Sequence, residues 1–159
     1  MTITRLDRVS IFGDKLSFLI PHEWVEDTDE AEDVYLYHAP GTDSGWLRLS
    51  LITAKNSSAK ARDLLAERAR QESGNLYQSD RNLIANGERP SPEGGVPIYQ
   101  YWWAVLRSLG PALSREALFS YTILADRQGD AETQDAVSIL SDLFCNAEFS
   151  DPAGSTVAN

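Results

Sequence analysis

Apolar and polar side chains alternate along much of the chain, and this period of two predicts a protein built mainly from β-strands. The alternation is clearest in residues 46–52, where Leu47, Leu49 and Leu51 are separated by Arg48 and Ser50. The expected strands are residues 9–12, 16–20, 34–37, 46–52, 97–107 and 117–124, with one or two more in 76–85. The first two flank Gly13-Asp14, a pair typical of a tight hairpin turn.

Two segments instead repeat apolar residues every three or four positions, which is typical of helices. The first is expected to begin near Ala59, after a capping Ser57 or Ser58, and to end at Gly74. Its apolar stripe is Ala61, Leu64, Leu65 and Ala69, and the stripe of the second helix (residues 131–146) is Ala136, Val137, Leu140, Leu143 and Phe144. Residues 86–96 hold three glycines and two prolines, which predicts a loop, with Glu88–Gly95 as a candidate binding loop.

These elements predict an α+β fold: a twisted, mostly antiparallel sheet flanked by helices, one on each side or both on one side. A chain of 159 residues is long enough for one domain with a substantial core. We expect residues 1–150 to form a single domain. The small and polar residues 151–159 are expected to form a flexible C-terminal tail.

The net charge of -10 and the pI of about 4.6 disfavour a nucleic acid or an anionic membrane surface as the partner. No apolar run approaches the roughly 20 residues that span a bilayer. The first residues lack the apolar segment of a secretory signal, and Cys145 has no second cysteine with which to pair. These features predict a cytoplasmic protein.

Acidic residues are concentrated in one short stretch, residues 23–33, which holds no basic residue. Its acidic members are Glu23, Glu26, Asp27, Asp29, Glu30, Glu32 and Asp33. Such a stretch can steer a basic protein to a docking surface, although it would equally serve as a solvated loop that keeps the protein soluble. It lacks the spacing and the central glycine of a calcium loop.

Aromatic residues are concentrated in the strand expected at residues 97–107. Tyr99, Tyr101 and Trp103 share one face of it, and Trp102 lies on the other. Under a helix these side chains would be core, whereas on an uncovered face they would form a patch suited to a protein partner or an apolar ligand. They are not interleaved with basic residues, which argues against a platform for single-stranded nucleic acid.

No motif of a known catalytic or metal site is present. His22 and His38 are the only histidines, and they have neither metal-ligand spacing nor a nearby Gly-x-Ser-x-Gly. Gly94-Gly95 is not followed by Lys-Ser/Thr, so a phosphate loop is not expected. Cys145 follows Phe144 on the second helix and is expected to be a small buried side chain. We therefore expect no metal and no cofactor.

The strand at residues 16–20 ends in Ile20-Pro21, Trp24 follows, and the closing helix leads to Phe149. This order of parts resembles the Mog1/PsbP-like group, which includes the DcrB-type bacterial proteins, over about residues 8–149. His22-Glu23 stands where that group usually has a small residue before the tryptophan. The resemblance implies an α/β/α sandwich, generally non-enzymatic, that binds a small GTPase, a photosystem or, as a chaperone, a secreted effector. It carries over no functional residue.

The pattern, the charge and the resemblance together predict a non-catalytic protein-binding module, such as a bacterial accessory, chaperone or immunity-like protein, with a basic or apolar partner. The acidic stretch would steer the partner, and Tyr99, Tyr101 and Trp103 would anchor it. A carrier of small apolar ligands and an enzyme of unrecognised type are the alternatives. A homodimer is a further option, because a second copy could cover an open sheet face or edge.

Overall fold

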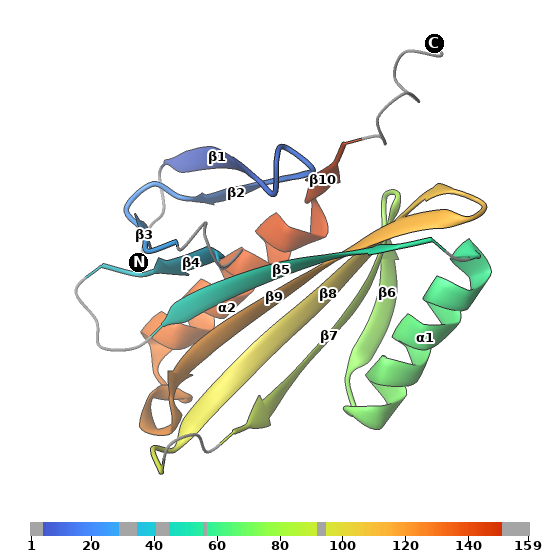
Figure 1. Ribbon diagram of the computed structural model, residues 1–159. Helices are drawn as coiled ribbons and strands as arrows, with labels where there is room; N and C mark the ends of the chain where they lie inside the picture. Colours follow the sequence, from blue (N-terminus) through green and yellow to red (C-terminus); the bar gives the residue numbers. More distant parts are fainter. Residues whose placement is uncertain (1–4, 29–34, 41–44, 56, 92–94, 151–159) are drawn as a thin grey trace.

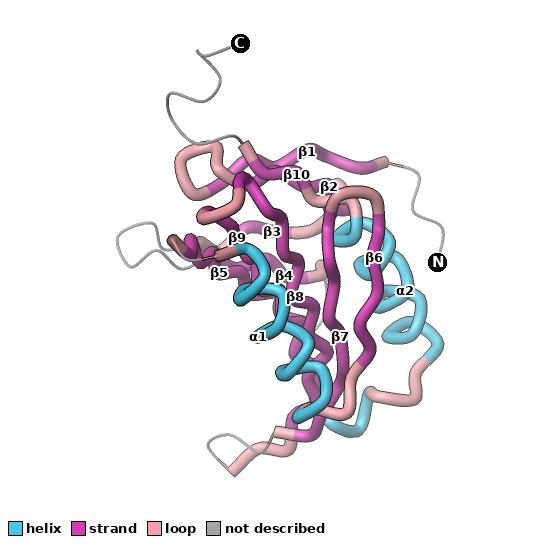
Figure 2. The backbone as a smooth tube through the Cα atoms, turned by 90° about the vertical axis from the view of Figure 1, so that its right-hand side faces the viewer, coloured by secondary structure: helices cyan, strands magenta, loops and turns pink. Residues whose placement is uncertain are grey.

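The computed structural model describes residues 5–28, 35–40, 45–55, 57–91 and 95–150. A seven-stranded antiparallel sheet forms the centre, with one helix on each face and a separate three-stranded sheet (Figure 1). Turned by 90°, the molecule shows the two helices on opposite sides of the large sheet (Figure 2). The prediction of an α+β fold with a mostly antiparallel sheet is confirmed.

The long hairpin β8–β9 lies in the middle of the large sheet. The strand order is β3-β4-β5-β9-β8-β7-β6, and all neighbours are antiparallel. The strands are β3 (Val25–Glu26), β4 (Tyr35–His38), β5 (Trp46–Ala54), β6 (Asn75–Ser79), β7 (Asn82–Pro90), β8 (Ile98–Gly110) and β9 (Leu113–Leu124). Neighbours in sequence are mostly neighbours in space, as expected for strands joined by short turns.

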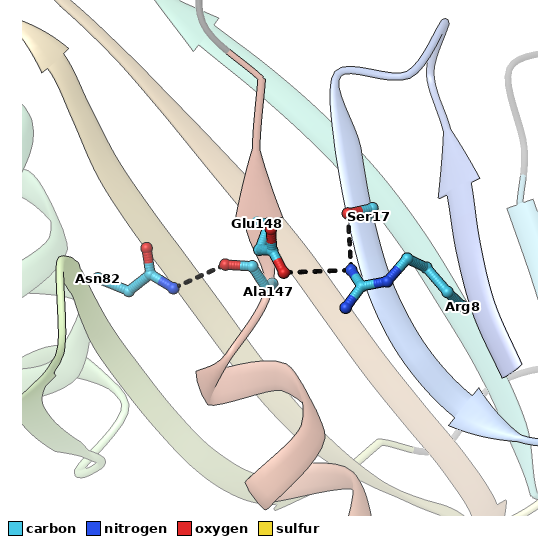
Figure 3. A network of polar contacts seen from close by, with 5 residues as sticks. All are labelled: Arg8, Ser17, Asn82, Ala147 and Glu148. Atoms are coloured by element: carbon cyan, nitrogen blue, oxygen red, sulfur yellow. Dashed lines mark hydrogen bonds and ion pairs between the residues drawn. The ribbon is translucent and has the colours of Figure 1, made fainter. Parts of the chain in front are cut away.

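The small sheet joins the two ends of the chain. It consists of β1 (Leu6–Ile11), β2 (Leu16–Pro21) and β10 (Glu148–Phe149), with β2 in the middle. The hairpin predicted at Gly13-Asp14 is present, and both residues have positive φ, 63° and 64°. Arg8 of β1 reaches across the sheet, donating hydrogen bonds of 3.2 Å each to Ser17 and to Glu148 of β10 (Figure 3).

The main core lies between the large sheet and α2 (Ala131–Cys145), which follows the short 3-10 helix η2 (Ala125–Arg127). The predicted stripe of α2 is confirmed: Ala136, Leu140 and Phe144 are buried, and Val137 and Leu143 pack at the margin. The Phe144 ring stacks on Phe119 of β9 with centroids 4.0 Å apart. Phe18 of β2 packs edge-on against both rings, so the small sheet closes the same core.

The other face of the large sheet carries α1 (Ser58–Gln71). The predicted cap is confirmed, because the Ser57 hydroxyl accepts a hydrogen bond of 3.0 Å from the Lys60 backbone N–H. Ala61, Leu65 and Ala69 are buried as predicted, but Leu64 is 58% exposed. The reason is that the contact is a narrow seam of residues four apart, and Leu64 lies about a quarter-turn away from it.

The loop predicted at residues 86–96 is partly wrong, because β7 continues to Pro90 and pairs with β8 throughout. Gly87 does not break the strand; it makes room for Trp102. A Cβ at Gly87 would lie 2.9 Å from the Trp102 indole nitrogen. The first part of the candidate binding loop, Glu88–Pro90, is therefore strand, and residues 92–94 lie outside the described part.

A buried polar link fixes the end of α2 to the sheet. Asn82 of β7 donates hydrogen bonds to the backbone carbonyls of Ala147 (2.9 Å, Figure 3) and Cys145 (3.2 Å). It accepts a hydrogen bond of 2.8 Å from the Arg107 Nε–H of β8. Since unmade hydrogen bonds are costly inside a protein, this link holds the segment between α2 and β10 in one position.

Candidate partner-binding face

The two faces of the large sheet are covered to different extents. α2 and the small sheet cover one face, where the largest cluster of buried side chains lies. On the other face, α1 packs its buried side chains against residues of β7 and β8, chiefly Leu83, Ala85, Trp102, Ala104 and Leu106. α1 does not lie over β4 or over most of β5 (Figure 1). Half of this face is therefore open.

The strand register identifies the side chains of the uncovered half. Trp46 of β5 is paired with His38 of β4 and with Thr122 of β9, and directly paired residues point to the same face. Leu47, the next residue, points into the core under α2 and is fully buried. We call the uncovered surface the open face; its residues are Val25, His38, Trp46, Arg48, Ser50, Ile52, Leu118, Ser120 and Thr122.

Large apolar side chains are exposed on the open face and beside it. Ile52 is 49% exposed, Val25 46% and Trp46 37%, and Leu64 of α1 borders them. These are four of the seven exposed large apolar residues in the described part of the chain, so more than half lie on this one side. They lie in two places on this side: Val25 and Trp46 near one end of β5, and Ile52 and Leu64 near the other, with Arg48 and Ser50 between them.

Two hollows run along α1 where it meets the open face. One is a pocket of about 200 Å³ between α1, β5 and the ends of β8 and β9, lined by Ile52 and Leu65 among others. The other, of about 610 Å³, is wider and more polar and is lined by Trp102 and Leu118. Leu64 and Arg68 line both, so the two hollows are adjacent, and we call them together the α1 groove.

Most charged groups of the α1 groove are paired with one another, and the remaining one, Glu67, is paired with Arg70 outside the lining. Arg68 of α1 donates a hydrogen bond to Glu116 of β9 at 2.8 Å, and Arg89 donates one to Glu72 at the same distance. Because each cation has an anion beside it, the groove has little net charge of its own. Its walls therefore favour an apolar or neutral group over an ion.

The described part of the acidic stretch lies at one border of the open face. Glu23, Glu26 and Asp27 are exposed, and Glu26 belongs to β3, the outermost strand on that side. The remaining acidic residues of the predicted docking surface, Asp29, Glu30, Glu32 and Asp33, lie outside the described part. Glu26 is paired with Tyr37, a residue of the main core, so its side chain points to the α2 side of the sheet and away from the open face. Of the predicted steering charge, the described part thus lies at the β3 border and not on the open face itself.

The prediction that aromatic residues of β8 anchor the partner is wrong for two of its three residues. Tyr101 and Trp103 are only 3% and 2% exposed, because they face α2 and belong to the main core. Tyr99 is half-buried at the end of the strand, where its hydroxyl donates a hydrogen bond of 2.9 Å to Glu88. This face of the strand is therefore core covered by a helix, and it is not an uncovered patch for a partner.

Sequence reasoning missed Trp46, Ile52 and Leu64 as surface residues. Leu64 was assigned to the buried stripe of α1, and Trp46 and Ile52 were counted only as part of a strand. A signal was present in β5. Trp46 and Ile52 fall on the same alternate positions as Arg48 and Ser50, so they are large apolar residues on the strand's polar face.

Neither histidine has the surroundings of a catalytic base. His22 Nδ1 lies 2.8 Å from Asp7 Oδ2 in an exposed pair. His38 Nδ1 contacts the Ala39 carbonyl at 3.1 Å, and its ring lies 4.5 Å from the Trp46 ring. Among the described residues, no serine hydroxyl bonds to either ring, and no group of three or more His, Cys, Asp or Glu could hold a metal. Nothing in this geometry indicates catalysis.

Cys145 is half-buried at the end of α2, and its thiol lies 3.1 Å from the Tyr77 hydroxyl. Burial raises the pKa of this thiol, which keeps it protonated and poorly nucleophilic. The expected role as a small packing residue agrees with this position.

Comparison with solved structures supports the fold. A structure from Bacteroides thetaiotaomicron matches 91% of this chain with a TM-score of 0.63 at 18% identity. The chain spans 48% of that protein, about half its length. LpqN of Mycobacterium tuberculosis, described as involved in cell envelope biogenesis, matches 92% of this chain and 91% of its own, with a TM-score of 0.61 at 10% identity. At such identities the likeness concerns the fold alone.

No protein-family model matches the chain, and no curated protein matches it by sequence. No helix within the described ranges is both long enough and apolar enough to cross a bilayer.

Proposed function

We propose that this chain is a non-catalytic protein-binding module and that its partner docks on the open face. The observation that carries the proposal is the group of exposed Val25, Trp46, Ile52 and Leu64 on the half of the sheet that α1 leaves uncovered. Protein interfaces typically combine such an apolar centre with a polar rim. On the open face the apolar residues Trp46 and Ile52 lie toward the two ends of β5, with the polar Arg48 and Ser50 between them, so apolar and polar contacts are both offered to a partner.

The charge distribution favours a partner whose apolar patch is bordered by basic residues. Glu23, Glu26 and Asp27 lie at the β3 border, and the whole chain carries a net charge of -10. Long-range attraction of this kind raises association rates and is weakened by salt. The partner is therefore expected to associate more slowly as the ionic strength rises, while the apolar contacts hold the complex once it has formed.

The proposal includes a role as an accessory, chaperone or immunity-like protein. It also includes kinship with the Mog1/PsbP-like group and a cytoplasmic location. The alternative of a small-ligand carrier predicts a closed apolar cavity. Both hollows of the α1 groove are open to the surface, which favours a docked protein over an enclosed ligand.

The test is a pull-down from native lysate with the tagged full chain, in parallel with Ile52→Asp and with Leu6→Asp as a matched control. Leu6 is 40% exposed but belongs to β1 in the small sheet, away from the open face. A specific partner should be captured by the wild type and by Leu6→Asp, and lost with Ile52→Asp. Its capture should also be weaker at about 500 mM than at about 50 mM salt.

A partner captured equally by both variants would contradict docking on the open face. Capture that depends on Leu6 would move the interface to the small sheet. The purified partner should then bind with the same order of affinities in isothermal titration.

A further inference from the structure

Arg48 is the one permanently charged residue among those that define the open face. Its side chain is exposed, and along β5 it lies between Trp46 and Ser50 on the same face. Across the neighbouring strands it is paired with Leu36 of β4 and with Ser120 of β9, which share its face. All four of these neighbours are uncharged, so a lone cation stands between the two apolar ends of the face.

The guanidinium of Arg48 has no counter-charge of its own in the described part of the chain. No ion pair or hydrogen bond joins it to another described residue. Glu116, which is paired with Ile52 on the same side of the sheet, is already bound by Arg68 at 2.8 Å. In the free chain water solvates the Arg48 charge, and any partner that displaces this water has to replace it.

Docking on the open face would displace that water. A protein that contacts both Trp46 and Ile52 has to cross the two residues between them, and one of these is Arg48. Burying a charge without a partner is strongly unfavourable, whereas a buried charge that is paired and hydrogen-bonded is tolerated. The guanidinium is planar and matches a carboxylate with two parallel hydrogen bonds, which makes an aspartate or glutamate side chain its best counterpart.

We propose that the docked protein presents an aspartate or glutamate to Arg48, flanked by apolar side chains that contact Trp46 and Ile52. The inference rests on the proposed function and deepens it, because it states the chemistry of the partner's surface. That surface carries a carboxylate inside its apolar patch and basic residues only where it meets the β3 border. Arginine and tryptophan are among the residues that contribute most to binding at protein interfaces.

The first test needs no known partner. A library of random peptides displayed on phage is selected on the immobilised full chain. The wild type should enrich peptides with an Asp or Glu flanked by apolar residues, whereas Arg48→Glu should enrich Lys or Arg at that position. Arg62→Glu, an exposed arginine of α1 that lines neither hollow, is the matched control and should select like the wild type. No acidic enrichment, or the same enrichment with Arg48→Glu, would overturn the inference.

The second test measures the pair directly with a synthetic peptide of the selected sequence, titrated by calorimetry. Arg48→Gln should weaken binding about tenfold or more. Arg48→Lys should lose less, because it keeps the charge and loses only the forked geometry. Replacing the acidic residue of the peptide by its amide should weaken binding to the wild type but not to Arg48→Gln. Independent, additive losses would mean that the two groups do not meet.

Thermal unfolding of the same variants guards against a structural explanation. Because Arg48 is exposed and bonded to no described residue, neither Arg48→Gln nor Arg48→Lys should change the unfolding temperature. A loss of binding that follows a loss of stability in both variants would assign Arg48 to the fold and would count against the proposed pair.

The two proposals fail in different ways. If Ile52→Asp abolishes capture of the partner from lysate and Arg48→Gln leaves it unchanged, docking on the open face stands and the carboxylate is wrong. If acidic peptides bind through Arg48 but no captured partner depends on Ile52, the carboxylate site stands and the proposed docking is wrong. With a partner in hand, changing its anchoring acid to lysine should restore binding to Arg48→Glu and to no other variant.

Discussion

The face of the large sheet under α2 and the face under α1 are built from different side chains. Under α2, the aromatic rings of Phe18, Trp103, Phe119 and Phe144 pack in edge-on and stacked pairs, and the small sheet covers one side of this core. Under α1, four of the eight buried residues are alanines, Ala61 and Ala69 of the helix and Ala85 and Ala104 of the sheet, and Trp102 is the only aromatic residue of this cluster. Small side chains let the helix approach closely but cover little of the sheet.

The difference shows how one sheet can be both scaffold and binding surface. Large apolar rings on the α2 side bury enough surface to stabilise the fold. The α1 side has the complementary property, because apolar side chains such as Ile52 and Trp46 are only partly covered and remain 49% and 37% exposed. Loss of stability should therefore come mainly from changes on one side, and loss of binding from changes on the other.

The largest expected effect is that of Phe144→Ala. The ring is fully buried and contacts Phe18, Trp103 and Phe119, so its removal should lower the free energy of unfolding by about 3–5 kcal/mol. Urea denaturation measures the change, with Leu64→Ala on α1 as the comparison, expected within about 0.5 kcal/mol. Similar losses in the two variants would mean that the two faces are equally covered.

A smaller loss is expected for Gly87→Ala, on the α1 side. The new methyl group would lie 2.9 Å from the Trp102 ring, and such overpacking should cost about 1–3 kcal/mol. Chemical denaturation should show the loss, and tryptophan fluorescence of the folded protein should shift as the indole moves. Gly129→Ala, where a methyl would meet nothing within 4 Å, is the control and should change neither signal.

Alkaline pH should act on the α2 side. Burial raises the pKa of Tyr121 in β9 to about 12, and burial together with the contact to Cys145 raises the pKa of Tyr77 in β6 to about 12. In the unfolded chain both ionise near their ordinary pKa of about 10. Their contribution to stability is therefore fully present below about pH 10 and is lost as the pH rises toward 12.

Unfolding free energies between about pH 9 and 11.5 measure this loss, and Tyr77→Phe should flatten the profile. Titration of tyrosinate absorbance in the folded protein gives an independent check. If both tyrosines ionised at their ordinary pKa in the native state, they would cause no fall of the unfolding free energy with pH, and the prediction would be wrong.

The smallest effect on stability is expected for Ile52→Asp on the open face. About half of this side chain is already exposed, but the new carboxylate would lie directly across from Glu116 of β9, so the free energy of unfolding should fall by about 1 kcal/mol or less. Thermal unfolding checks this value on the same samples used for the pull-down. A marked loss of stability would mean that Ile52 supports the fold and would remove the basis for its use as a binding variant.

Most of the fold was predictable because its elements follow simple periodicities. The alternation in β5, β8 and β9 and the helical stripe of α2 identify the strands and the main helix. Which helix covers which face of the sheet was not predictable in the same way. β8 carries aromatic residues on both faces, Tyr101 and Trp103 on one and Trp102 on the other, so its sequence does not show which face lies under which helix.

The open face depends on where α1 lies across the width of the sheet, and no local sequence pattern encodes that position. α1 packs over β7 and β8 and leaves β5 uncovered, and this placement decides that Leu64 and Ile52 are exposed. Gly87 in β7 is a similar case. Its glycine indicated a loop, whereas its role is set by the distant Trp102 indole that packs against it.

The small sheet has a consequence for how the protein is made. β2 leaves the ribosome before all the strands of the large sheet, whereas its partner β10, at Glu148–Phe149, leaves after them. Until then Phe18 has no Phe144 to pack against, and Arg8 has no Glu148 to bind. The central hairpins can form during translation, whereas closure of the core must wait until α2 and β10 have been synthesised. A nascent chain of this protein therefore exposes the β1–β2 hairpin until α2 and β10 emerge, and in that interval the hairpin is vulnerable to aggregation and proteolysis.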